Sequence, residues 1–114
     1  MIYIARDPKD VCVSAYHHMT SLAHFNFTSS FDDFVAMFAA GNVESGSWWS
    51  HVAPWWGLRH SPRVLFLTYE ALESDLECCV RQISLFIGLG LLNNDIVDAV
   101  VAQSAFEAMK DDPR

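Results

Sequence analysis

The sequence is poor in positive charge and in cysteine. Seven Lys and Arg residues stand against 14 Asp and Glu residues, which gives a formal net charge of −7. This balance argues against nucleic acid or an anionic membrane as a partner, so any bound anion must be held locally. The three cysteines, Cys12, Cys78 and Cys79, are odd in number and two are adjacent. They suit neither a disulfide framework nor spaced zinc ligands, and we interpret them as reduced thiols, with no metal expected.

Long apolar runs are also missing. No run reaches the roughly 18 residues of a membrane span, and the start does not have the order of a signal peptide. We therefore expect no membrane partner and a cytoplasmic location. With 114 residues, 52% of them hydrophobic, the chain fits one domain unit over residues 1–114 with much of it buried. Because the strand-like run Ile2–Ala5 follows Met1 directly, we expect a portion of a larger domain.

Strand and helix signals alternate along the chain. Residues 2–5 and 64–67 are apolar runs typical of strands, and the second run suggests a strand buried on both faces of a parallel sheet. Capping residues, proline, glycine and apolar spacing predict helices over residues 8–18, 31–40, 48–59, 76–87 and 94–101. This order predicts a parallel α/β arrangement with helices flanking the sheet.

Four tryptophans form a block between residues 48 and 56. The spacing of seven residues between Trp48 and Trp55, and between Trp49 and Trp56, is two helical turns and favours packing. An acceptor-binding or partner surface is the alternative.

Arg6 lies where the first strand gives way to a helix. In open parallel sheets, ligands bind beyond the carboxyl ends of the strands, and anions favour the first turn of the next helix. The guanidinium group matches phosphate geometry, and Ser14, about two turns into the helix, offers a hydroxyl to the same anion. The alternative is that Arg6 pairs with Asp7, Asp10 or Glu70.

Four blocks in the same order resemble the cytosolic sulfotransferase family. They run from Ile2 to His18, from Gly46 to Trp56, from Val64 to Glu70 and from Phe106 to Lys110. The first resembles the segment that binds the 3′-phosphate of 3′-phosphoadenylyl sulfate (PAPS). The resemblance covers nearly the whole chain and implies part of a P-loop-type parallel sheet flanked by helices.

The resemblance implies roles for six residues in nucleotide binding. Arg6 and Ser14 would bind the 3′-phosphate. The adenine and ribose pocket would be lined by Tyr69, Ser104, Phe106 and Met109. Without the resemblance, Tyr69, at the end of a buried strand, and Phe106 are typical of core residues, and Ser104 with Glu107 forms an ordinary capping box.

No residue of this chain is expected to be catalytic. Sulfuryl transfer needs a base for the acceptor's proton, but none of the five histidines matches the family's catalytic histidine, which lies upstream of the matched segment. At most, His18 or His24 would border the pocket for a small-molecule acceptor, an alcohol, phenol or amine. The oligomeric state is not indicated by the sequence.

The chain also departs from the family pattern. It contains neither the Pro-Lys-Ser-Gly-Thr-Thr-Trp loop for the 5′-phosphosulfate nor the Arg-Lys-Gly segment of the 3′-phosphate site, and Ala105 replaces a hydroxyl residue. We therefore expect the full-length form to move a sulfuryl group from PAPS, and this fragment alone to be inactive. The alternatives are an inactive nucleotide-binding remnant and a helical protein-interaction module.

Overall fold

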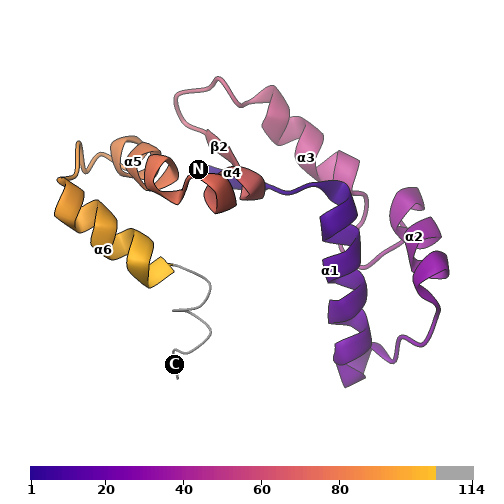
Figure 1. The fold of residues 1–114 in the computed structure, drawn as a ribbon. Coiled ribbons are helices and arrows are strands. Elements are labelled where there is room, and N and C mark those ends of the chain that lie inside the picture. Colours follow the sequence, from indigo (N-terminus) through magenta and orange to yellow (C-terminus); the bar gives the residue numbers. More distant parts are fainter. Residues whose placement is uncertain (105–114) are drawn as a thin grey trace.

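The computed structural model describes residues 1–104. Two short strands lie at the centre, with helices on either side (Figure 1). The elements in order are β1 (Ile2–Ala5), α1 (Pro8–Ser21), η1 (Ala23–Phe25), α2 (Phe31–Ala40), α3 (Trp48–Gly57), β2 (Leu65–Thr68), α4 (Tyr69–Ser74), α5 (Leu76–Phe86) and α6 (Asn94–Ser104).

The two strands pair in parallel, which confirms the predicted α/β class. Ile2 lies opposite Leu65 and Ala5 opposite Thr68, so both strands end at the same edge of the sheet. The long connection through α1, α2 and α3 makes this parallel pairing possible. At the opposite edge, the Met1 amino group donates to the Arg63 carbonyl oxygen at 2.8 Å, which fixes the register from the start of β1.

The predicted helix starts are confirmed at α1 and α2. Asp7 caps α1 by accepting from the Lys9 backbone N–H at 2.8 Å, and Pro8 occupies the first turn. Ser30 caps α2 by accepting from the Asp33 N–H at 3.2 Å. Both caps satisfy backbone donors that have no partner inside the helix.

The second strand differs from the prediction. It begins at Leu65 rather than Val64, and Tyr69 does not end a strand but begins α4. The reason is that the Thr68 hydroxyl accepts from the Ala71 N–H at 3.1 Å, which starts a helix directly at the end of the strand. The strand is also only partly covered: Leu67 is buried, while Leu65, Phe66 and Thr68 are half-buried.

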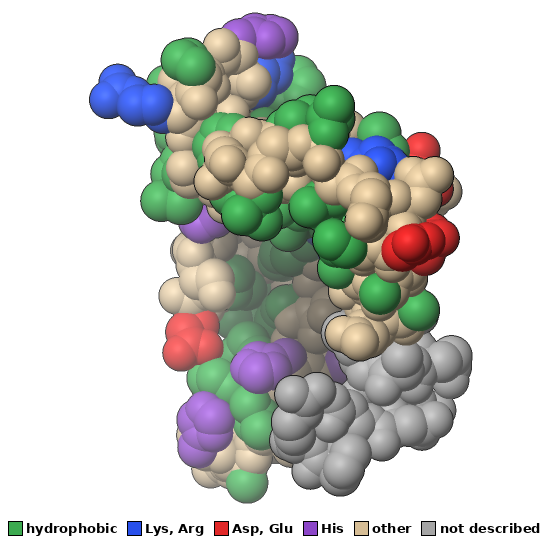
Figure 2. All heavy atoms as spheres, turned by 90° about the vertical axis from the view of Figure 1, so that its left-hand side faces the viewer, with side chains coloured by type: hydrophobic (Ala, Val, Ile, Leu, Met, Phe, Trp, Pro, Cys, Tyr) green, Lys and Arg blue, Asp and Glu red, His purple; other side chains and the backbone are tan. Residues whose placement is uncertain are grey.

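The chain is open rather than compact. Its radius of gyration is 17.3 Å, against about 13 Å for a compact domain of this length. Phe34 and Val97 are fully buried, but many large hydrophobic side chains stay exposed. Figure 2 shows hydrophobic side chains spread over one face and around a recess at its centre. The expectation that much of the chain is buried is therefore met only in part by the described residues.

The tryptophans of α3 divide between packing and exposure. Trp55 stacks on Tyr3 of β1 with ring centroids 5.1 Å apart, and so attaches α3 to the sheet. Trp49 and Trp56 remain 65% and 53% exposed. Trp56 nevertheless packs edge-on against Phe66 of β2, with ring centroids 5.4 Å apart. The packing interpretation therefore holds for Trp55, holds in part for Trp56 and does not describe Trp49. No helix within residues 1–104 is both long and apolar enough to cross a membrane.

Candidate functional site

Arg6 lies directly after β1 and two residues before α1 begins. Its guanidinium carbon is 4.4 Å from the ring centroid of Tyr69, the first residue of α4. Arg6 and Tyr69 follow the two parallel strands at the edge where both strands end. The structure therefore brings together two of the six residues that the resemblance assigns to the nucleotide.

The polar partners of Arg6 are weak or absent within the described residues. Although 36% of the side chain is exposed, its Nε atom is buried and forms no hydrogen bond in this part of the chain. The nearest carboxylate oxygen, Asp10 Oδ2, is 4.0 Å from Nε, at the outer limit of an ion pair. A buried donor without an acceptor costs free energy, so this N–H is suited to an acceptor from outside the described residues.

Glu70 does not pair with Arg6. Its Oε1 accepts the Asp7 backbone N–H at 2.8 Å, so the first turn of α4 holds the turn between β1 and α1. Of the three alternative partners for Arg6, only Asp10 comes within ion-pair range. An exposed pair of this kind contributes at most about 1 kcal/mol.

Ser14 is exposed on α1, one turn beyond Asp10. Residues four apart lie on the same helix face, so Ser14 lies on the face of α1 that Asp10 turns toward Arg6. Ser14 and Arg6 therefore lie along one stretch of surface beside the ends of the two strands.

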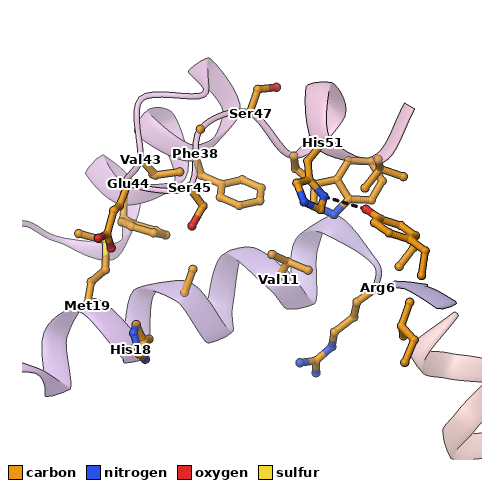
Figure 3. A pocket seen from close by; sticks show the side chains of 18 residues that line it. Arg6, Val11, His18, Met19, Phe38, Val43, Glu44, Ser45, Ser47 and His51 are labelled. Atoms are coloured by element: carbon orange, nitrogen blue, oxygen red, sulfur yellow. Dashed lines mark hydrogen bonds between the residues drawn. The ribbon is translucent and has the colours of Figure 1, made fainter. Parts of the chain in front are cut away.

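A pocket of about 300 Å³ lies between β1, α1 and the loop from α2 to α3. Arg6 is at one end, and His18, Met19 and Glu44 lie toward the other (Figure 3). The rest of the wall is mostly apolar. Of the two histidines expected to border an acceptor, His18 lines this pocket. His24 in η1 is exposed, packs against Phe25 with ring centroids 4.0 Å apart and is not part of this wall.

Tyr3 and His51 form a polar contact in the same wall. The Tyr3 hydroxyl and His51 Nδ1 are 2.8 Å apart (Figure 3). Burial raises the pKa of the Tyr3 hydroxyl, so the phenol keeps its proton and can donate it to Nδ1. In that arrangement the proton of a neutral His51 ring lies on Nε2. The sequence did not mark Tyr3, His51 or Glu44 as pocket residues, because they lie in β1, in α3 and in the loop between α2 and α3, which only the fold brings together.

A second pocket, of about 400 Å³, lies on the tryptophan side of the sheet. Arg6, Thr68 and Glu70 line it together with Trp49 and Trp56. Arg6 belongs to the walls of both pockets, so it is a side chain that a ligand in either one can reach.

Three assigned nucleotide contacts lie at the end of the chain. Ser104 is exposed and is the last residue of α6. Phe106 and Met109 lie outside the described residues, as do Ala105 and Glu107. Within residues 1–104, no group of three His, Cys, Asp or Glu side chains is arranged to hold a metal ion.

The fold places the chain among the parallel α/β domains, whose ligands bind beyond the carboxyl ends of the strands. The sequence model of the family described as "Sulfotransferase domain" matches residues 1–114. The chain belongs to the sulfotransferase domain family.

Known relatives agree with this membership. The chain is 40% identical to sulfotransferase 1A1 of Bos taurus over 113 residues, which are 99% of this chain and 38% of that protein. Among solved structures, mouse sulfotransferase SULT7A1 complexed with PAP has a TM-score of 0.90 at 31% identity, covering 97% of this chain and 40% of that one. Retinol dehydratase in a complex with retinol and PAP has a TM-score of 0.89 at 38% identity, covering 97% of this chain and 32% of that one. The chain therefore spans less than half the length of these relatives.

Proposed function

We propose that the full-length protein is a PAPS-dependent sulfotransferase. It transfers a sulfuryl group from PAPS to a hydroxyl or amine of a small molecule in the cytoplasm, and this chain supplies contacts to the 3′-phosphate and the adenosine. The observation that carries the proposal is Arg6 at the edge where both strands end, because its buried Nε has no hydrogen-bond partner among residues 1–104. Two structures of relatives are complexes with PAP, the nucleotide left after sulfuryl transfer, which supports the same ligand here.

The described residues suit a phosphate at this position. Arg6 offers planar donors of fixed geometry, and the Tyr69 ring holds its guanidinium group from one side. The amino end of α1 adds partial positive charge close by, and the Ser14 hydroxyl lies along the adjoining helix face. Together these groups can hold an anion although the chain as a whole is acidic.

The transfer itself forms a bond between the acceptor oxygen or nitrogen and sulfur. The bond between sulfur and the phosphate oxygen of PAPS breaks, PAP leaves, and the acceptor's proton passes to a base. By the family resemblance that base is a histidine outside this chain. The role of the described residues is to fix the nucleotide, because a sulfuryl group held in one orientation reacts faster with a positioned acceptor.

A nucleotide titration with a transfer assay tests the proposal. We expect the full-length protein to bind PAP, and to move isotope-labelled sulfuryl from PAPS to a phenol such as 4-propylphenol. Binding without transfer would favour an inactive nucleotide-binding protein. If PAP did not bind at all, the proposal would be wrong.

A further inference from the structure

The 300 Å³ pocket has opposite charges at its two ends. Arg6 stands at the end next to the strands, and the Glu44 carboxylate lies toward the other end beside Met19 and His18 (Figure 3). We propose that this pocket takes the acceptor, and that the preferred acceptor is a hydroxyl compound whose far end carries a cationic amine that pairs with Glu44. This inference rests on the proposed sulfuryl transfer.

The walls between the two ends suit an apolar body. The apolar part of the wall includes Val11 and Ala15 of α1, Phe34 and Phe38 of α2, and Val52 of α3. A volume of 300 Å³ is at the lower end of the range for small-molecule sites. The pocket therefore fits a molecule of one or two rings.

Glu44 is available to a ligand. No hydrogen bond or ion pair within residues 1–104 engages its carboxylate, and the residue is exposed. The other titratable or charged groups of the pocket wall are Arg6, Tyr3, His18 and His51, and His51 already contacts Tyr3. Glu44 is thus the one carboxylate among the described residues of this wall.

The position of Glu44 is fixed by a tight loop. Gly41 ends α2 with a positive φ of 74°, and a side chain added there would come within 2.9 Å of Ser47 Cβ. Gly46 closes a turn by donating to the Val43 carbonyl oxygen at 2.8 Å, again with a positive φ. Because both ends of the loop are held in this way, Glu44 is kept beside α1 rather than carried on a long, loose segment.

The charge of Glu44 sets the orientation of the acceptor in the pocket. A protonated amine has no lone pair to attack sulfur, so the amine binds Glu44 and the hydroxyl points toward the nucleotide. An acceptor with a carboxylate at the same place would be repelled by Glu44. The acidic chain as a whole also attracts cations rather than anions.

Binding of matched phenols tests the inference without requiring turnover. Tyramine and 4-propylphenol have the same size and differ in one charged group, so their dissociation constants for the full-length protein isolate the effect of the amine. We expect tyramine to bind more tightly than 4-propylphenol. We expect Glu44→Gln to weaken tyramine by about three- to tenfold and to leave 4-propylphenol unchanged, as suits a partly exposed charge pair.

Two controls separate this inference from the proposed function. Glu73→Gln removes the same charge from α4, outside both pocket walls, and should change neither phenol. PAP affinity, measured on the same samples, reports the nucleotide site alone. If PAP binds but Glu44→Gln affects both phenols equally, or neither, or if neither phenol binds to the unaltered protein, the inference is overturned while the nucleotide site stands. If PAP fails to bind, the proposed function itself is wrong, and with it the inference.

Discussion

The two strands end side by side, but the chain continues differently after each. After β1, Arg6 and Asp7 separate the strand from α1, while after β2 the helix α4 begins at the next residue. Asp7 caps the first helix and Thr68 caps the second. The first junction therefore has two residues between strand and helix, Arg6 and Asp7, and the second has none.

The second junction supports the first. Tyr69, at the start of α4, lies against the Arg6 guanidinium group, and Glu70 accepts the Asp7 N–H. A side chain that binds a ligand needs neighbours that hold its position. The two junctions therefore have different roles. The residues after β1 offer the Arg6 donor, and the residues after β2 hold that donor in its orientation.

Removing the Arg6 guanidinium group should have the largest effect on PAP binding. We expect Arg6→Ala to weaken PAP binding by the full-length protein by about 10- to 100-fold, because a charge-assisted hydrogen bond is lost. Arg63→Ala, at the opposite edge of the sheet, is the matched control and should change the affinity little. Isothermal calorimetry measures both. Equal losses in the two variants would mean that Arg6 acts only through net charge.

The next largest effect is expected from removing the hydrogen bond between Asp7 and Glu70, which joins the two junctions. Glu70→Ala leaves the Asp7 N–H without its acceptor, and we expect the free energy of unfolding to fall by about 1.5 kcal/mol. Urea denaturation measures the change. Glu73→Ala, in the same helix, should be close to neutral, and a similar loss there would contradict a specific role for Glu70.

Removing either of the two helix caps, Asp7 or Thr68, should cost a similar free energy of unfolding. We expect Thr68→Ala and Asp7→Ala each to lower the free energy of unfolding by about 1 kcal/mol, the usual cost of losing a helix cap. Only Asp7→Ala also removes negative charge near Arg6. A comparison of PAP affinities separates the two effects: Thr68→Ala should leave affinity almost unchanged, and a large loss would show that Thr68 contacts the ligand.

The smallest effect is expected from the aromatic support. Tyr69→Leu keeps the apolar bulk but removes the ring below the guanidinium group, and we expect PAP binding to weaken about two- to threefold. Tyr69→Phe keeps the ring and serves as the control. A much larger loss in both variants would indicate that the hydroxyl contacts the nucleotide.

Much of the fold was readable because local signals agreed with it. The β1 run, the Asp7-Pro8 helix start and the Ser30 cap each predicted the element that the structure has. The start of α4 was missed because Thr68 is both a good strand residue and a good cap, and only its hydrogen bond to Ala71 decides between them. The exposure of Trp49 and Trp56 could not be read either, since spacing gives the helix face but not what covers it.

The site was less readable than the fold. Arg6 could be predicted because ligands of open parallel sheets generally bind beyond the carboxyl ends of the strands, where Arg6 lies. Tyr69 was picked out by resemblance, but its contact with Arg6 depends on two strands joined across some 60 residues. Glu44 gave no signal, because an acidic residue in a loop looks like any solvated residue until the loop folds onto α1.

The proposed nucleotide site depends on Arg6, whose buried Nε would receive its acceptor from the nucleotide. Nuclear magnetic resonance of the full-length protein with nitrogen-labelled arginine tests this directly, with the Arg6 signal assigned by its loss in Arg6→Lys. We expect the Arg6 Nε–H resonance to shift as PAP is added, while that of Arg63 stays in place. If PAP binds and the Arg6 resonance does not move, Arg6 does not hold the nucleotide.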